Sequence, residues 1–283
     1  MKVGIDLGGT KLLMVAESPA GRSVSRVPTG TGFGPADLED AIAAFVASLP
    51  APPDALGIAF PGLVAEDRTI LACDVLPRLV GWRPSLAVAG PWAFAIVNDG
   101  EAALIAEARD EDDAANVAVV VVGTGIGAAF QVGGRILRGA AGWAGELGSI
   151  PIATGGTVRT LDQLASGQAI VEQARCGGAE LEALAAGGDA RILAIVRDAG
   201  AALGLGLATV VHMLNPSVLA LGGGVLRLPG YADAARASAR THTLPAMWET
   251  CAMREMRDGE HAAAVGAALA ASSRAIPPRE EAS

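Results

Sequence analysis

Three short stretches of the sequence carry residue types that suit phosphate chemistry. They are DLGGTK at residues 6–11, NDG at residues 98–100 and GTGIGA at residues 123–128. Glycine allows backbone N–H groups to approach a phosphate closely, and a carboxylate at a strand end is able to act as a base on a hydroxyl group. Phosphoryl transfer needs little more than positioning, charge neutralisation and such a carboxylate, so the stretches together predict a phosphate-handling site.

The first stretch has two interpretations. Asp6 is able to hold Mg²⁺, directly or through water, because magnesium prefers carboxylate oxygen, and Thr10 is able to donate to a phosphate oxygen. The alternative is an ordinary hairpin turn at Gly8-Gly9. The stretch is not a Walker loop, which needs G-x-x-x-x-G-K-[ST], and it is not a dinucleotide-binding fingerprint, because no helix is expected after it.

The other two stretches are also open to a structural interpretation. Asp99 follows an apolar strand and is a candidate base, but Asn98-Asp99 also fits the start of a helix as an N-cap, and both roles can hold at once. GTGIGA fits a second hairpin turn. The two glycine turns, each after an apolar strand, are more specific together than either is alone.

The pattern of strands and helices restarts halfway along the chain. Strand, glycine turn and strand are expected at residues 2–18 and again at 117–132. This restart predicts two similar α/β lobes, with a nucleotide between them that touches both turns. The other elements expected from periodicity are a third strand at 20–30, helices at 36–49 and 101–110, and a strand within 55–64 that ends at Pro61-Gly62. Further strands are expected at 92–100 and 218–226, helices over most of 161–213 and a closing helix at 260–275.

Composition narrows the class of protein. The chain has 283 residues, of which 51% are apolar, and a net charge of −9, which argues against a nucleic-acid partner and against a polybasic membrane surface. Its cysteines, Cys73, Cys176 and Cys251, are far apart and form no C-x-x-C motif, which is typical of reduced thiols in a cytoplasmic protein. Met1 is not followed by a long apolar signal region, and we expect no membrane-spanning segment.

Five motifs occur in an order that resembles one known family. They are VGIDLGGTK at 3–11, GIAFPGLV at 57–64, VNDGEAALIAEA at 97–108, VGTGIGAAFQVGGRILRGAAGWAGELG at 122–148 and LALGGGV at 219–225. Together they resemble the ROK family of sugar kinases and sugar-responsive repressors, within the actin/hexokinase superfamily. The resemblance covers nearly the whole chain.

The resemblance implies a fold and an assembly. The expected fold is α/β: a two-lobed actin-like ATPase (ribonuclease H-like) fold with a nucleotide cleft between the lobes. We expect a small lobe from residues 1–97 plus 262–275, a larger lobe from 98–261 and a frayed tail at 276–283. It also implies a homodimer, with Mg²⁺-ATP and a small sugar as ligands.

The same resemblance implies roles for individual residues. Asp99 is then the general base on a sugar hydroxyl, usually that at C6, while Gly62, Asn98 and Glu146 bind the sugar. The residues implied for ATP phosphates and Mg²⁺ are Asp6, Gly8, Gly9, Thr10 and Lys11 in the first lobe, and Gly123, Thr124, Gly125 and Gly127 in the second. The turn Gly222-Gly223-Gly224 is implied to lie beside the nucleoside.

The chain departs from the family pattern around the sugar. Members usually continue Gly-Glu-x-Gly-His, and that His binds the sugar and often a structural zinc with nearby cysteines; here the position is Ser149, and residues 152–167 contain no Cys or His. Thr160 stands at the last zinc cysteine, so we expect no zinc. Asp162 replaces a family Glu that reaches the sugar, and Arg78 replaces a common Asn.

These departures leave two interpretations open. Either this is a zinc-free branch acting on an ordinary hexose, or its pocket is retuned for an amino sugar, an acidic sugar or a cyclitol. Arg78 would favour an anion, but a solvated surface arginine is the commoner case.

Two competing functions, a repressor and a non-catalytic sugar sensor, are disfavoured. No DNA-binding segment is expected before the first strand, and Asp6, Thr10, Asn98 and Asp99 are retained.

Overall fold

The computed structural model describes residues 1–19, 21–65 and 67–274, and these form two compact units. The first unit contains Met1–Arg109 and the described residues from Glu260 onward, and the second contains Asp110–Gly259. The first unit extends past the predicted boundary at residue 97 because helix α3 (Asp99–Ala108) packs along helix α10 (Ala262–Arg274). The predicted frayed tail at 276–283 lies outside the described residues.

The first unit is built on a mixed sheet with the order β3-β2-β1-β4-β7. Strand β1 pairs antiparallel with β2 and parallel with β4, which pairs parallel with β7. The central strands are mostly apolar and buried along most of their length, as expected for strands that are covered on both faces. The bounds are β1 (Lys2–Leu7), β2 (Lys11–Ser18), β3 (Gly21–Pro28), β4 (Ala55–Phe60) and β7 (Ala93–Asn98).

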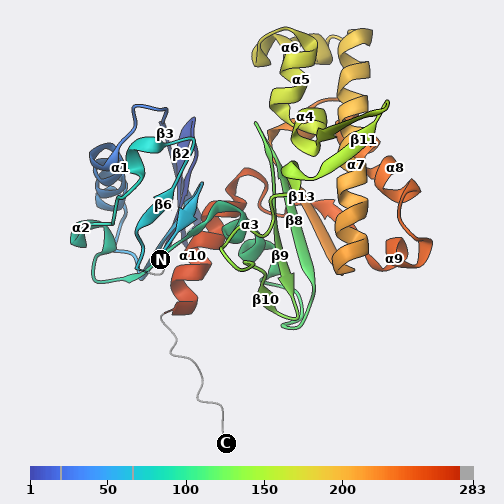
Figure 1. The fold of residues 1–283 in the computed structure, drawn as a ribbon. Coiled ribbons are helices and arrows are strands. Elements are labelled where there is room, and N and C mark those ends of the chain that lie inside the picture. The colour runs from blue at the N-terminus through green and yellow to red at the C-terminus, as the bar shows by residue number, and fades with distance from the viewer. Residues whose placement is uncertain (20, 66, 275–283) are drawn as a thin grey trace, which may run out of the picture. The chain divides into compact units, whose positions relative to one another are not determined.

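Helices cover both faces of this sheet (Figure 1). Helix α1 (Pro35–Ala47) packs on one face, where Ile42 joins a cluster of large aliphatic side chains, and short helix α2 (Leu86–Ala89) lies beside α1. The other face carries α10 and α3. Here the contact is made by small residues, because a Cβ atom at Gly57 would lie 1.8 Å from the carbonyl oxygen of Ala267. Glycine therefore allows α10 to lie directly against the sheet.

The second unit repeats the sheet of the first. Its order is β10-β9-β8-β13-β14, with β8 antiparallel to β9 and parallel to β13, and β13 parallel to β14. The repeat of strand, glycine turn and strand predicted from the sequence is confirmed. The bounds are β8 (Val117–Val122), β9 (Ile126–Val132), β10 (Arg135–Ile136), β13 (Val218–Gly222) and β14 (Ala252–Glu255).

Helix α7 (Ala190–Leu214) is the central helix of the second unit. It packs against α8 (Tyr231–Thr241) and α4 (Leu161–Ala165). Within the described ranges it is the one helix long and apolar enough to cross a membrane, and 56% of its most apolar stretch is buried in the fold. Its hydropathy is thus accounted for by packing in the core. The remaining helices of this unit are α5 (Gly167–Ala174), α6 (Gly178–Ala186) and α9 (Pro245–Thr250).

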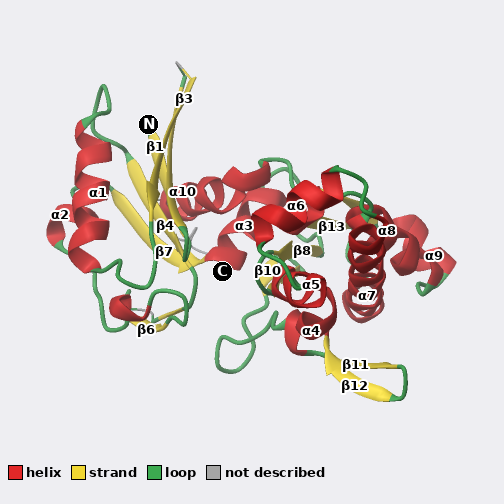
Figure 2. Cartoon of the chain, turned by 90° about the horizontal axis from the view of Figure 1, so that it is seen from above, coloured by secondary structure: helices red, strands yellow, loops and turns green. Residues whose placement is uncertain are grey.

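Short elements complete the two units. Figure 2 shows the hairpin of β11 (Pro151–Thr154) and β12 (Thr157–Thr160) projecting beyond α4. The other short elements are β5 (Leu63–Val64), β6 (Ile70–Ala72) and the 3-10 turns η1 (Pro77–Leu79), η2 (Leu147–Ser149), η3 (Gly224–Arg227) and η4 (Gly259–His261).

Two predicted strands are shorter than expected. The strand predicted at 92–100 ends at Asn98, directly before α3, and the strand predicted at 218–226 ends at Gly222. The strand that starts at Ala55 ends at Phe60, so its predicted end at Pro61-Gly62 is confirmed.

Candidate active site

The first group of predicted residues lies at one edge of the first sheet. Strands β1, β4 and β7 are parallel and adjacent, with Asp6 opposite Ala59 and Phe60 opposite Asn98. Their carboxyl ends therefore meet at the same edge, which is where open α/β sheets bind ligands. Asp6, the Pro61-Gly62 turn and Asn98-Asp99 are brought together there.

Asn98 connects the ends of two of these strands. Its Oδ1 accepts from the N–H groups of Gly100 at 2.9 Å and Glu101 at 3.3 Å, which makes it the N-cap of α3. Its Nδ2 donates to the carbonyl oxygen of Gly62 at 3.2 Å. Gly62 also packs tightly against the main chain of Ala72, because a Cβ atom at Gly62 would lie 2.1 Å from the carbonyl oxygen of Ala72. Both the capping role and the expected proximity of Asn98 to Gly62 are present.

Asp99 is the first residue of α3, and its charge acts on Asp6. The Oδ1 atom of Asp99 accepts from the N–H of Gly100 at 2.8 Å. Burial raises the pKa of Asp6 to about 7; the negative charge of Asp99 adds to this rise, while Lys11 opposes it. A bound cation would relieve both the burial cost and the repulsion. A half-buried carboxylate beside a second one is therefore a donor set that fits Mg²⁺.

The glycine turn between β1 and β2 is a tight hairpin. The N–H of Gly8 donates to the carbonyl oxygen of Lys11 at 2.9 Å, and the Thr29 hydroxyl donates to that of Gly8 at 2.6 Å. Gly8 and Gly9 are not among the described glycines with positive φ. A Cβ atom at Gly9 would lie 3.1 Å from Cβ of Val75, so close packing is what favours glycine there. Thr10 is exposed at the tip of this turn.

Lys11 is engaged by a residue that the sequence analysis did not identify. Its ammonium pairs with a carboxylate oxygen of Glu260 at 2.8 Å, and Arg26 pairs with the other oxygen at 2.7 Å. These hydrogen bonds lower the pKa of Glu260 to about 2. No sequence signal pointed to Glu260, because it lies far from both partners along the chain.

The second group of predicted residues begins with the turn between β8 and β9. The carbonyl oxygens of Gly123 and Thr124 accept from the N–H groups of Gly167 at 2.9 Å and Gln168 at 3.2 Å, at the start of α5. The described chain has no cis peptide, so each carbonyl points opposite to the N–H of its own peptide unit. The N–H groups of Thr124 and Gly125 are therefore directed away from α5, as adjacent donors suited to an anion. Gly127 is exposed on β9.

The glycines at the end of β13 lie beside this turn. Gly223 has a φ of +103°, and a Cβ atom there would lie 2.2 Å from the carbonyl oxygen of Val122, the last residue of β8. A Cβ atom at Gly222 would lie 2.4 Å from Sδ of Met256. Gly224 then starts η3. Glycine is thus required here by backbone conformation and close packing.

The predicted sugar residues of the second unit surround η2. Glu146 directly precedes this turn and Ser149 ends it, and both are exposed. Gly145 before them has a φ of +108°, and a Cβ atom there would lie 2.0 Å from the carbonyl oxygen of Ala128. The Glu146 turn is therefore held tightly against β9.

Two predicted substrate residues make main-chain contacts. Oδ1 of Asp162 accepts from the N–H of Ile126 at 2.7 Å. Arg78 is exposed, and its Nη1 donates to the carbonyl oxygen of Gly32 at 2.6 Å. For Arg78 this contact favours the structural interpretation over anion binding.

Hydrogen bonds order residues 152–167, the segment that by resemblance carries zinc ligands in other family members. Thr160 caps α4: its Oγ1 accepts from the N–H of Gln163 at 3.3 Å, and the Gln163 side chain accepts from the N–H of Thr160 at 3.1 Å. In the part of the chain that the structure describes, no three His, Cys, Asp or Glu side chains are grouped so as to hold a metal ion. The absence of zinc stays a prediction.

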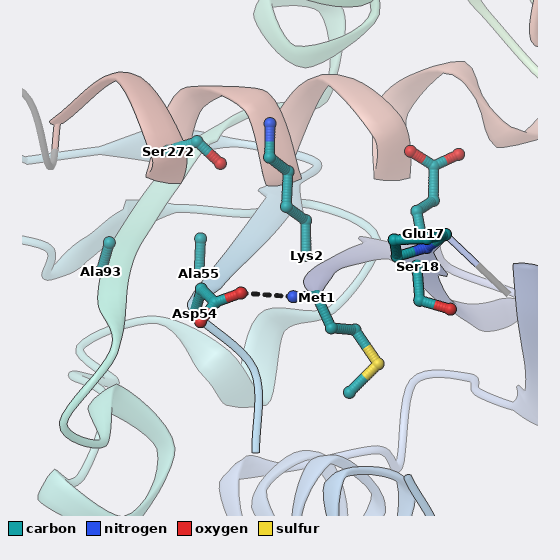
Figure 3. A pocket seen from close by; sticks show the side chains of 9 residues that line it. Met1, Lys2, Glu17, Ser18, Asp54, Ala55, Ala93 and Ser272 are labelled. Carbon is teal, nitrogen blue, oxygen red and sulfur yellow. Dashed lines mark hydrogen bonds and ion pairs between the residues drawn. The ribbon is translucent and has the colours of Figure 1, made fainter. Parts of the chain in front are cut away.

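A cavity of about 480 Å³ lies at the other end of the first sheet (Figure 3). Its lining includes Lys2, Ala55 and Ala93, the first residues of β1, β4 and β7, and the ion pair between the Met1 amino group and Asp54. None of the predicted site residues lines it. The cavity is therefore at the amino ends of the parallel strands, away from Asp6 and Asn98.

Comparison with known proteins gives consistent results over the whole chain. The sequence model of the ROK family matches residues 2–274. The ROK hexokinase of Thermus thermophilus is 30% identical, with a TM-score of 0.78 over 97% of this chain and 99% of that one. The glucokinase of Streptomyces griseus, solved with glucose and AMPPNP, is 27% identical, with a TM-score of 0.75 over 96% of this chain and 99% of that one.

Curated relatives match over parts of their length. The bifunctional enzyme NanE/NanK of Brucella melitensis biotype 1 is 30% identical over 174 residues, which are 58% of this chain, and the chain spans only about a third (32%) of that protein. The N-acetylmannosamine kinase of Escherichia coli O157:H7 is 27% identical over 249 residues, 81% of this chain and 84% of that one. The fold is the mixed α/β fold of the solved ROK structures, and the chain belongs to the ROK family.

Proposed function

We propose that this protein is an ATP-dependent sugar kinase that phosphorylates a hydroxyl group of a hexose-like sugar, with Asp99 as the general base. The observation that carries the proposal is the pair Asp6 and Asp99 at the carboxyl edge of β1, β4 and β7, where the charge of Asp99 adds to the raised pKa of buried Asp6. The similar hexokinase, glucokinase and N-acetylmannosamine kinases support the reaction class.

Each carboxylate has a separate role in this proposal. Asp99 accepts the proton of the attacking sugar hydroxyl, for which the C6 hydroxyl is the first candidate, and Asn98 and Gly62 orient the sugar beside it. Asp6 holds Mg²⁺, directly or through water. The ion, when bound, neutralises charge on the phosphate oxygens of ATP. The N–H groups of Thr124 and Gly125 donate to phosphate oxygens.

The sugar we favour is an N-acylated amino sugar. The N-acetylmannosamine kinases among the relatives support this class. So does Ser149, since a small hydroxyl replaces the family imidazole and leaves room for a larger substituent. A zinc-free kinase of plain hexoses is the alternative within the same reaction class. Homodimeric assembly stays a prediction from the resemblance, and cytoplasmic location stays a prediction from the cysteine pattern.

A kinase assay on Asp99→Asn tests the proposal. Purified wild type is offered Mg²⁺-ATP and a panel of hexoses, amino sugars and cyclitols, with mass detection of the phosphorylated product. Loss of a general base lowers turnover by a factor on the order of 10² or more, while sugar binding largely survives because the side-chain shape is kept. The matched control is Asp40→Asn, an exposed acid on α1. Near-normal turnover in Asp99→Asn contradicts the assignment of the base, and a wild type inactive on every sugar contradicts the kinase.

A further inference from the structure

Asp162 holds the glycine turn between β8 and β9. Its Oδ1 accepts from the N–H of Ile126 at 2.7 Å, directly after Gly125. The residue lies in the first turn of α4, whose start is fixed by the capping box of Thr160 and Gln163. The carboxylate is therefore delivered to the turn by a helix with a defined start.

The start of α5, which directly follows α4, makes two further hydrogen bonds to the same turn. The N–H groups of Gly167 and Gln168, at the start of α5, donate to the carbonyl oxygens of Gly123 and Thr124. Between the two helices, the hydroxyl of fully buried Tyr231 donates to the carbonyl oxygen of Ala165 at 2.6 Å. The junction of α4 and α5 is thus hydrogen-bonded to a residue of the core. It contacts the turn at residues 123–126 on the side opposite to the N–H groups of Thr124 and Gly125.

The Asp162 carboxylate also contacts the turn that carries Glu146 and Ser149. A Cβ atom at Gly148 would lie 2.4 Å from Oδ2 of Asp162 and 2.5 Å from Oδ1. Gly148 therefore leaves the space that the carboxylate fills. One side chain thus lies between the turn at 123–126 and the turn at 146–149.

We infer that Asp162 is a positioning residue for the phosphate-binding turn, and not a ligand of the sugar. This inference rests on the proposed function only in assigning phosphates to the turn. Asp162 acts through Ile126: it fixes the Gly125–Ile126 peptide unit, which directly follows the two units whose N–H groups, at Thr124 and Gly125, are aimed at the phosphates. An Asp suits this role better than a Glu, because the carboxylate of a longer side chain would press on Gly148 and Gly125. The Cβ position of Gly125 already lies 3.6 Å from Oδ1 of Asp162.

Amide hydrogen exchange of the ligand-free protein tests the positioning role directly. Asp162→Ala removes the acceptor, so exchange in the segment 123–127 rises at least fivefold. Asp162→Asn keeps an acceptor oxygen of the same reach and preserves the slow exchange of wild type. Gly148→Ala, which pushes a methyl group into the carboxylate, increases exchange as Asp162→Ala does. The matched control is Asp198→Ala, which removes an exposed carboxylate from α7 in the same unit and leaves exchange in this segment unchanged.

Titration with AMPPNP in the absence of sugar then measures the consequence for binding. Asp162→Ala weakens AMPPNP binding about tenfold, while Asp162→Asn and the control Asp198→Ala bind as wild type does. A sugar ligand would give the opposite result: unchanged exchange and AMPPNP affinity in Asp162→Ala, with a raised KM for the sugar in both Asp162→Ala and Asp162→Asn. That result overturns the inference. If wild type binds no AMPPNP, the proposed function fails, and the exchange data still decide the role of Asp162.

Discussion

The Asn98 side chain joins the carboxyl ends of two parallel strands: Nδ2 donates to the carbonyl oxygen of Gly62 at 3.2 Å, and Oδ1 caps α3. Asp99 is the next residue. The proposed base therefore lies in the first turn of a helix whose start is fixed by the cap and by the bond from Asn98 to Gly62. Since the Gly62 position admits no Cβ atom, the loop that receives the Asn98 amide has little freedom to move.

Replacing Asn98 separates these two contributions. Asn98→Ala loses the cap and the bond to Gly62, and we expect it to lower the free energy of unfolding by about 1–3 kcal/mol, as losses of caps and buried hydrogen bonds do. Asn98→Ser keeps a capping oxygen but lacks the donor, so its stability lies between those of wild type and Asn98→Ala. Urea unfolding measures all three proteins. Equal stability of Asn98→Ala and wild type contradicts the double role.

Asp6 makes the stability of the ligand-free protein depend on pH. Its pKa is about 7 in the folded protein against an ordinary value of 3.8. Between these values the folded protein keeps a proton that the unfolded chain has lost, so the free energy of unfolding falls as pH rises through this window. Asp6→Asn removes the effect. We expect the variant to be more stable than wild type at pH 8 by about 1–4 kcal/mol, since one pKa unit is worth about 1.4 kcal/mol, and equal to it below pH 4.

Magnesium provides the control for this prediction. In EDTA at pH 8 the difference between wild type and Asp6→Asn is largest. Added MgCl₂ raises the unfolding temperature of wild type, because the ion binds the ionised carboxylate of the folded state, and leaves Asp6→Asn unaffected. A variant that is less stable than wild type at pH 8 in EDTA contradicts the raised pKa of Asp6. Equal responses to MgCl₂ contradict the metal site.

Metal analysis tests the expected absence of zinc. Thr160, at the position of a family zinc cysteine by resemblance, uses its hydroxyl to accept from Gln163 in the capping box of α4. Hydrogen bonds thus order a segment in which Cys and His are absent from residue 143 to residue 175. We expect no stoichiometric zinc in dialysed protein and no fall in melting temperature with chelator. One tightly held zinc ion per chain overturns this prediction.

Much of the fold followed from local patterns in the sequence. Residues 117–122 are an apolar run of strand length, residues 2–7 are mostly apolar apart from Lys2 and Asp6, and each leads into a glycine turn, so the repeat of the two sheets was predictable. The hairpin at 151–160 was missed because most of its side chains are exposed and it lacks an alternating apolar face. The start of α3 at Asp99 depends on the cap by Asn98, which the sequence analysis had offered as one of two readings.

The candidate site was less predictable where long-range contacts decide a side chain's role. Lys11 stands in a motif that suits phosphate, yet its ammonium pairs with Glu260, which no spacing rule connects to it. Asp162 was assigned to the sugar by resemblance, and its carboxylate bonds to Ile126. In both cases the residue type was informative about charge and hydrogen bonding. The partner depended on the tertiary packing of elements distant in the sequence.

Ser149 is the remaining position at which substrate preference can be changed by one substitution. It is exposed at the end of η2, three residues after Glu146, and stands where the family has a His that binds the sugar. Because Asp162 is already engaged by Ile126, we change Ser149 alone. Ser149→His fills the space left by the missing imidazole and offers a new partner to a plain hexose hydroxyl. A buried hydrogen-bonding partner is worth about 1–3 kcal/mol, so the ratio of kcat/KM for glucose to that for N-acetylmannosamine should rise about tenfold to a hundredfold.

The control is Ser149→Ala, which adds no partner and should leave the use of glucose unimproved. If wild type already phosphorylates glucose at least as well as every modified sugar in the panel, the retuned pocket is wrong and the chain is a zinc-free kinase of plain hexoses.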